Sequence, residues 1–241
     1  GWGAPAHPEL AALCDAARPR IEPWLAEIAA VRDEAADAIP VQECDAAAPY
    51  WSNGWLPPLD ALMLMAVLKT RRPKRLIEIG SGHSTRFARW AVTRWETGTH
   101  ITSIDPQPRA DIDALCDALV RAGLEDADFD LFDDIAPGDV VSLDGSHRSM
   151  KNSDVTVFFL EVLPRLPKGV LVHIHDVFLP DDYPPEWNRR WYNEQYLLAT
   201  ALLFGSTLTV EMPVHWAART YAPPLPHDGD PYPGTGFWLS T

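Results

Sequence analysis

Several titratable residues of this sequence follow short apolar runs, at the points where the strands of an α/β protein would end. Asp144 and His147 follow the run 139–143, and His175 and Asp176 follow the run 169–174. Imidazole titrates near neutral pH, so either histidine could take a proton from a hydroxyl group. The sequence does not decide between His147 and His175. Together with Asp144 they form a candidate catalytic set.

The same residues suggest a metal site. Neighbouring strands lie about 5 Å apart, so a carboxylate after one strand and a His-Asp pair after the next can share an ion. Candidate ligands are Asp144, His175 and Asp176. Oxygen ligands alone favour Mg²⁺, and an imidazole moves the preference toward Mn²⁺, Fe²⁺ or Zn²⁺. In the alternative interpretation, Asp176 caps the following turn and the histidines are hydrogen-bonded core residues.

A glycine turn follows an earlier apolar run. The segment Arg75–Thr85 indicates a strand, a tight turn and a helix start, whose backbone N–H groups can approach a nucleotide-like ligand. Asp105 ends the next apolar run and is suited to hold ribose hydroxyls. Thr85 stands where a dinucleotide fingerprint has its third glycine, which argues against a pyrophosphate. S-adenosylmethionine fits these features, unless this is an ordinary βα turn. Its candidate contacts are Glu78, Gly80, Ser81, Gly82, Asp105 and Asp144.

Composition limits the classes of partner. The chain has 241 residues with 46% apolar content, enough for a substantial core. A net charge of −14 argues against nucleic-acid binding, and no run of eighteen apolar residues suggests a membrane span. The three cysteines are widely spaced, which favours reduced thiols. We therefore expect a cytoplasmic protein that acts on a small molecule, with no nucleic acid or membrane as partner.

Hydrophobic periodicity predicts an α/β fold with a doubly wound sheet. Residues 1–50 are expected to form a helical extension, able to dimerise or to cover the site, and 51–241 a single domain. Only a Pro/Gly-rich loop is seen before the last strand, so the last two strands should pair antiparallel. The aromatic loop 177–191 could roof the site with Tyr183, Trp187 and Trp191. The predicted helices are 59–69, 84–95, 110–122, 153–164 and 191–204, and the predicted strands are 76–79, 100–105, 127–132, 139–144, 169–176, 207–212 and 236–240.

Four motifs together resemble class I S-adenosylmethionine-dependent methyltransferases: Glu78–Thr85, Ile104–Pro106, Gly138–His147 and Val172–Val177. The nearest group is the small bacterial methyltransferase-domain proteins whose first motif reads Glu-Ile-Gly-Ser-Gly. This resemblance implies a Rossmann-like seven-stranded sheet, mostly parallel with an antiparallel C-terminal strand. It also implies contacts of the methionine moiety with the glycine turn and Glu78, and of the ribose with Asp105.

Metal-dependent O-methyltransferases of this fold, of the catechol and macrolide-sugar types, are similar in placing an aspartate at Asp144. Their acidic pair after the fifth strand would correspond here to His175-Asp176 or to Asp176-Val177, depending on the alignment. Neither pair matches fully, because valine cannot bind a metal and histidine changes the ligand type. The sequence therefore leaves open which metal is bound, if any.

Three functions remain for these residues. The first is O-methylation of a small hydroxylated substrate. The second is a metalloenzyme on the methyltransferase fold, with non-haem-iron or lyase chemistry at Asp144, His175 and Asp176. The third is a non-catalytic adenosyl-binding scaffold, which would not need so many titratable groups at one edge. The identity of the methyl acceptor cannot be read from the sequence.

Overall fold

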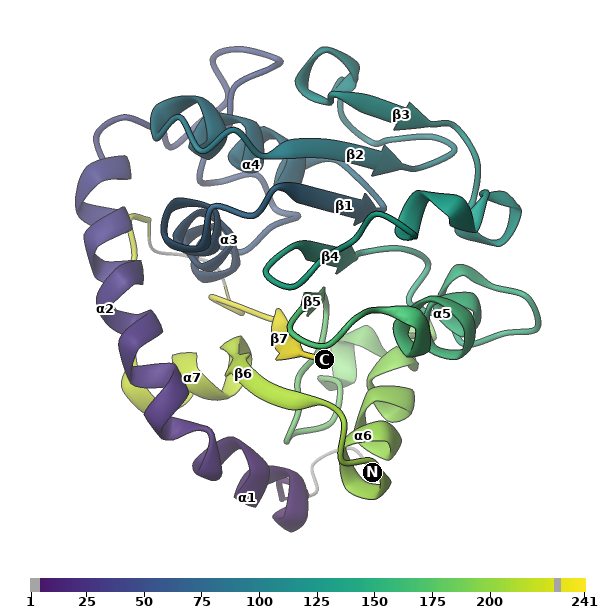
Figure 1. The fold of residues 1–241 in the computed structure, drawn as a ribbon. Coiled ribbons are helices and arrows are strands. Elements are labelled where there is room, and N and C mark those ends of the chain that lie inside the picture. Colours follow the sequence, from purple (N-terminus) through teal and green to yellow (C-terminus); the bar gives the residue numbers. More distant parts are fainter. Residues whose placement is uncertain (1–4, 228–230) are drawn as a thin grey trace.

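The computed structural model describes residues 5–227 and 231–241. Within these ranges one sheet has the strand order β3-β2-β1-β4-β5-β7-β6 (Figure 1). Strands β1 to β5 run parallel to one another, and β7 is antiparallel to both β5 and β6. This confirms the predicted Rossmann-like sheet with an antiparallel C-terminal strand. The strands are β1 Arg75–Ile79, β2 His100–Ile104, β3 Ala118–Val120, β4 Val140–Leu143, β5 Leu171–Ile174, β6 Thr209–Pro213 and β7 Phe237–Ser240.

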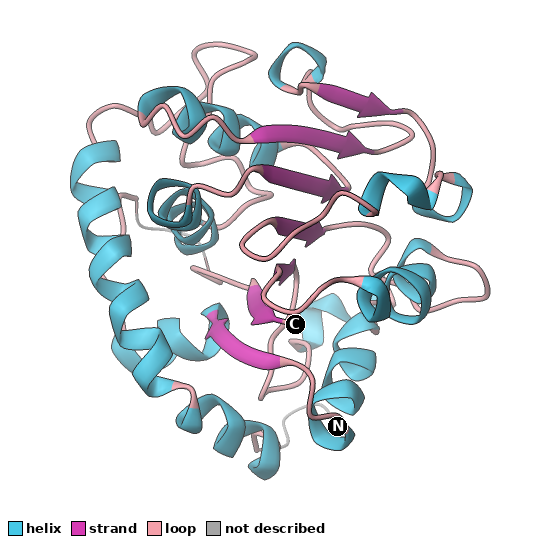
Figure 2. Cartoon of the chain, in the orientation of Figure 1, coloured by secondary structure: helices cyan, strands magenta, loops and turns pink. Residues whose placement is uncertain are grey.

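Helices surround the sheet (Figure 2). The near-continuous apolar sequence of α3 is explained by its position, since residues 58–68 of this helix are all buried. The predicted N-terminal helices α1 and α2 bury Leu10, Ile21 and Ile28 in the same core as the strands, so they pack on the sheet. The domain boundary at residue 50 remains a prediction. The helices are α1 Pro8–Ala16, α2 Arg18–Ala35, α3 Pro58–Arg71, α4 His83–Arg94, α5 Asp154–Val157, α6 Glu194–Phe204 and α7 Val214–Tyr221.

The segment between β2 and β4 differs from the prediction. A helix was expected over 110–122 and a strand near 127–132, but β3 lies at Ala118–Val120 and 3₁₀ turns occupy much of the rest. Asp117 explains the change. Its carboxylate accepts a hydrogen bond from the N–H of Ile101 on β2 (2.8 Å) and pairs with Arg89 on α4 (2.7 Å). These long-range bonds fix the segment along the sheet edge as a strand, which local periodicity could not indicate.

Two helical segments also differ in detail. The predicted helix 153–164 has a single α-helical turn, continues as a π-helix over Phe158–Val162 and ends in a 3₁₀ turn. Helix α7 was not predicted, and it lies in the connection between β6 and β7. The antiparallel pairing of these strands holds nevertheless.

Cys14, Cys44 and Cys116 are free thiols, as expected. Over residues 5–227 and 231–241, no helix combines the length and apolar character that crossing a membrane requires.

The sheet register determines where the site forms. Ile79 at the end of β1 is paired with Leu143 of β4, and Leu143 is paired with Ile174 of β5. The residues that follow these three strands therefore start at the same level, at the carboxyl edge of the sheet. Ligands of open α/β sheets bind at this edge.

Candidate active site

The glycine turn after β1 is pressed against the end of β4. Gly80 has φ +81°, and a β-carbon added to it would lie 1.8 Å from the carbonyl oxygen of Asp144. The N–H of Asp144 in turn donates to the carbonyl of Ile79 (2.8 Å). Only glycine fits here, both for its backbone angle and for the space available.

Thr85 explains how the turn holds its shape without a third glycine. Its hydroxyl donates to a carboxylate oxygen of Glu78 (2.7 Å) and accepts from the N–H of Gly82 (3.2 Å). Glu78 is buried, and this burial raises its pKa to about 7. The Glu78 carboxylate stabilises the turn through Thr85, and it lines neither of the two cavities described below. Its contact with a methyl donor stays a prediction.

Asp105 lies beside the same turn. One of its carboxylate oxygens accepts from the N–H of Ser81 (2.9 Å), and the other accepts from the N–H of Gln107 (2.8 Å). The hydroxyl of Ser81 also donates to that of Ser103 on β2 (2.8 Å). Asp105 borders the cavity described next, so lone pairs left on its carboxylate are available to a ligand. The predicted ribose contact is not tested by these bonds.

The glycine turn forms one wall of a cavity of about 480 Å³, which we call the first cavity. The ends of β1, β2 and β4 supply most of its lining, together with a short segment after β3. A cavity of this size suits a nucleoside-sized ligand. Its principal lining residues are Ile79–Ser84, Ile104–Gln107, Arg109, Gly123–Glu125, Asp144–Ser146, Trp55 and Leu56.

A second cavity, of about 530 Å³, adjoins the first. Trp55, Arg109 and Asp144 line both, so the two cavities meet at these residues. Aromatic side chains form much of its wall, among them Trp51, Trp187, Tyr192 and Tyr232, and its polar lining includes His147, His175 and Asp176.

The predicted aromatic roof is formed only in part. Trp187 lines the second cavity as expected. Tyr183 is buried beneath, and Trp191 is 74% exposed; both border a separate hollow on the surface.

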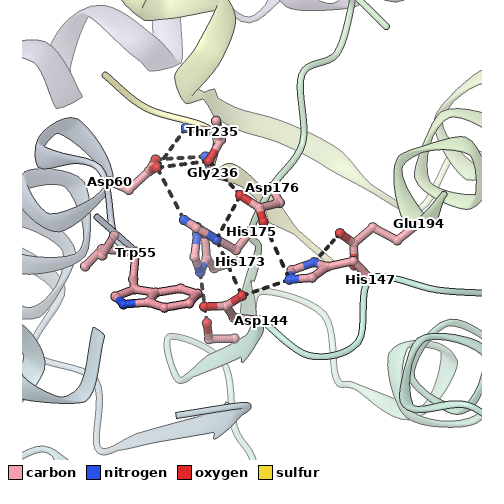
Figure 3. Close-up of polar contacts among 12 residues, drawn as sticks. Trp55, Asp60, Asp144, His147, His173, His175, Asp176, Glu194, Thr235 and Gly236 are labelled. Carbon is pink, nitrogen blue, oxygen red and sulfur yellow. Dashed lines mark hydrogen bonds and ion pairs between the residues drawn. The ribbon is translucent and has the colours of Figure 1, made fainter. Parts of the chain in front are cut away.

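The predicted catalytic and metal-binding residues form one cluster (Figure 3). His147 Nε2 lies 3.3 Å from Asp144 and 3.6 Å from Asp176. His175 Nδ1 lies 3.5 Å from Asp144 and 3.4 Å from Asp176. We call these four residues the His–Asp cluster. Each imidazole faces both carboxylates, and the sequence analysis placed all four at this edge.

Two further buried carboxylates lie behind the His–Asp cluster. Glu194, at the start of α6, lies 2.6 Å from His147 Nδ1 and is fully buried. Asp60 on α3 lies 3.5 Å from His175 Nε2 and accepts from the N–H groups of Thr235 (2.7 Å) and Gly236 (2.8 Å). The sequence analysis missed Asp60. A single carboxylate inside the apolar run 59–68 was the available signal.

The carboxylates determine the protonation of the histidines. Burial by itself lowers the pKa of His147, but Glu194, Asp144 and Asp176 outweigh it and raise the pKa well above the usual value. Burial is likewise outweighed at His175, whose pKa is raised by Asp144, Asp176 and Asp60. The two histidines in turn outweigh the effect of burial on Asp144 and lower its pKa. At neutral pH the cluster therefore consists of imidazolium–carboxylate pairs.

The backbone of the His–Asp cluster is unusual. His147 has φ +59° and Asp176 has φ +56°, a left-handed conformation uncommon for residues other than glycine. The carbonyl of His147 accepts from the N–H of Asn193 (2.9 Å), and the carboxamide of Asn193 accepts from the N–H of Ser149 (2.6 Å). These bonds join the loop after β4 to the segment before α6. Such conformations are concentrated at functional sites.

The predicted metal site is not supported by this geometry. His175 Nδ1 faces Asp144 and Asp176, and its Nε2 faces Asp60. In the part of the chain that the structure describes, no group of three or more His, Cys, Asp or Glu residues is arranged to hold a metal ion.

His173 serves a structural purpose. Its Nδ1 lies 2.8 Å from the hydroxyl of Ser142, and its ring stacks on Trp238 with centroids 4.7 Å apart. Burial lowers its pKa to about 4, so it is neutral at physiological pH.

Comparisons with known proteins give one family match, which covers part of the chain. Residues 77–177, from β1 to just beyond β5, match a family model described as a methyltransferase domain. No curated protein matches the chain. The sequence and fold are similar to a methyltransferase of Podospora anserina, PaMTH1, solved with SAH, at 17% identity and a TM-score of 0.45, covering 74% of this chain and 76% of that one. A Thermobifida fusca YX structure described as a candidate methyltransferase is 14% identical, with a TM-score of 0.41 and coverage of 78% and 83%. The segment from β1 to just beyond β5 is therefore similar to a methyltransferase domain, and it carries the five parallel strands of the Rossmann-like sheet.

Proposed function

We propose that this protein transfers a methyl group from S-adenosylmethionine in the first cavity to a hydroxyl oxygen of a small substrate in the second. The meeting of the two cavities at Asp144 carries this proposal. A methyl group passes in line from sulfur to oxygen, so donor and acceptor must lie on two sides of one junction. The junction is bordered by Asp144, Trp55 and Arg109.

The first cavity supplies what an adenosyl donor needs. In this proposal the methionine end approaches the backbone of Gly80–Gly82 and the ribose hydroxyls donate to Asp105, since all of these residues line the first cavity. Leu124 and Ile104 provide apolar lining for a flat base. The carboxylate of Asp144 stabilises the positive sulfonium, because opposite charges attract strongly where water is partly excluded.

His147 is the better candidate for the base that takes the hydroxyl proton. Glu194 holds Nδ1 at 2.6 Å, which fixes the ring and directs Nε2 toward the second cavity. A carboxylate that orients an imidazole in this way is a recurrent device in acid–base catalysis. His175 has no such short bond, and as an imidazolium it balances the charges of Asp144 and Asp176.

The reaction then has a single displacement step. The acceptor oxygen attacks the methyl carbon, the carbon–sulfur bond breaks, and the hydroxyl proton passes to Nε2 of neutral His147. The products are a methyl ether and S-adenosylhomocysteine. Since the pKa of His147 is raised, the neutral imidazole forms on the alkaline side, and the rate should increase with pH there.

Calorimetry with S-adenosylmethionine and S-adenosylhomocysteine tests the donor part of the proposal directly. Binding of both is expected, and Asp105→Ala should weaken it strongly. Absence of any binding to the purified protein would reject the proposal. Mass spectrometry of reactions with hydroxylated compounds and their O-methylated standards then tests the acceptor part.

A further inference from the structure

Two arginines line the second cavity and stack on its aromatic wall. The guanidinium carbon of Arg190 lies 3.9 Å from the ring centroid of Trp187, and that of Arg109 lies 4.5 Å from the ring centroid of Trp55. Stacking orients each planar guanidinium but leaves its N–H groups free in the ring plane. No carboxylate within 4.0 Å pairs with either arginine in residues 5–227 and 231–241.

The position of Arg190 is reinforced by the loop after β4. The side chain of Arg148 donates two hydrogen bonds to the carbonyl oxygen of Arg190, at 3.1 and 2.9 Å. The same loop carries His147, whose carbonyl accepts from the N–H of Asn193. Arg190 and the candidate base are therefore held on one connected segment of the cavity wall.

The charged lining of the second cavity favours an anion. Arg109, Arg190 and the protonated His147 and His175 contribute positive charge. Asp144 and Asp176 are already paired with the histidines, and Glu186 accepts a hydrogen bond from the hydroxyl of Tyr232. The guanidinium groups of Arg109 and Arg190 remain without a carboxylate partner among the described residues, in a chain whose net charge is −14.

We propose that the methyl acceptor is a hydroxylated aromatic carboxylic acid, whose ring packs on the aromatic wall and whose carboxylate is bound by Arg190 and Arg109. Guanidinium recognises carboxylate through paired hydrogen bonds, and tryptophan and tyrosine faces accept flat rings. A volume of about 530 Å³ is sufficient for an acid with one or two rings. The inference rests on the proposed function, because the hydroxyl must reach the junction at Asp144.

The test uses purified protein saturated with S-adenosylhomocysteine. Hydroxylated benzoic, cinnamic and naphthoic acids are titrated by calorimetry, each against its neutral amide of nearly the same shape. For at least one of these pairs the acid should bind about tenfold more tightly than the amide, as expected for a charge-assisted pair. Arg190→Gln and Arg109→Gln should each remove most of this preference and leave amide binding within about twofold.

Arg165→Gln provides a matched control, because Arg165 is also exposed and stacks on an aromatic ring, Phe129 (5.2 Å), away from both cavities. It should leave the preference for acids unchanged. Equal binding of acids and amides, or no binding of any of these compounds to the loaded protein, would overturn the inference. If Arg109→Gln weakens S-adenosylhomocysteine binding but keeps the preference for acids over amides, Arg109 does not belong to the carboxylate site. Failure of wild-type protein to bind S-adenosylhomocysteine would instead reject the proposed function.

Discussion

Nδ1 of His147 lies 2.6 Å from a carboxylate oxygen of Glu194, and both side chains are almost completely buried. The two residues come from different parts of the chain, the loop after β4 and the first turn of α6. A buried carboxylate at this distance fixes the orientation of the ring and stabilises its protonated form. The opposite nitrogen, Nε2, faces Asp144 and Asp176, as Figure 3 shows.

Glu194→Gln should lower the pKa of His147. The amide oxygen can still accept a hydrogen bond, but the negative charge that opposes the effect of burial is gone. NMR titration of protein labelled with ¹⁵N-histidine measures this change without any substrate. Once an acceptor is found, the pH at which the rate increases should shift to lower values in the same variant.

The control for this titration is Glu161→Gln, since Glu161 is exposed and lies outside both cavities. It should leave the titration of His147 unchanged. An unaltered His147 titration in Glu194→Gln would contradict the orienting role of Glu194.

Asp144→Asn should weaken the binding of S-adenosylmethionine more than the binding of S-adenosylhomocysteine. The two ligands differ in the charge at sulfur, and Asp144 is the carboxylate where the cavities meet. We expect the affinity for S-adenosylmethionine, a sulfonium, to fall about tenfold, or about 1.4 kcal/mol of binding free energy. The affinity for S-adenosylhomocysteine, a neutral thioether, should change little. Calorimetry with each ligand measures both values.

Asp105→Asn serves as the matched comparison. Asp105 accepts a hydrogen bond from Ser81 in the glycine turn and borders the first cavity, where we propose that the adenosyl group binds. The affinities for both ligands should therefore fall to a similar extent in Asp105→Asn. Equal losses of the two ligands in Asp144→Asn would show that Asp144 does not interact with the sulfonium.

Gly80→Ala should destabilise the protein, whereas Gly82→Ala should not. At Gly80, whose φ is +81°, an added β-carbon would lie 1.8 Å from the backbone oxygen of Asp144. At Gly82 an added β-carbon would have no atom within 4 Å. The cost for Gly80→Ala should be about 3 kcal/mol or more, which corresponds to a fall in Tm of about 6 to 12 °C. Thermal unfolding of both variants is the measurement. Comparable Tm values would mean that the turn is free to move away from β4.

Glu78→Gln should change how stability depends on pH. Burial raises the pKa of Glu78 in the folded protein from 4.5 to about 7. Between these values the unfolded chain releases a proton that the folded protein keeps, so the stability of the wild type decreases as pH rises toward 7. The full effect is roughly 3 kcal/mol.

Glutamine does not ionise and can still accept from the Thr85 hydroxyl. The Tm of Glu78→Gln relative to wild type should therefore be higher at pH 8 than at pH 5. Glu161→Gln, at an exposed position, should show no such difference. A constant Tm difference across this range would place Glu78 in contact with water or with a cation.

The sequence was sufficient for the order of most elements and for the members of the His–Asp cluster. Strand ends of a parallel sheet meet at one edge, so Asp144, His147, His175 and Asp176 could be placed together from the positions of the apolar runs alone. The glycine turn could be recognised for a similar reason, because backbone angles such as that of Gly80 restrict the residue type locally.

Other features depended on contacts between distant segments. The strand at Ala118–Val120 forms because Asp117 binds β2 and α4, which no local pattern records. Asp60 reaches His175 from a helix more than a hundred residues earlier. The protonation of the histidines follows from which carboxylates surround each ring. Residue type and spacing determine which groups reach the sheet edge, but distances and burial, which set charge and chemistry, exist only once the chain has folded.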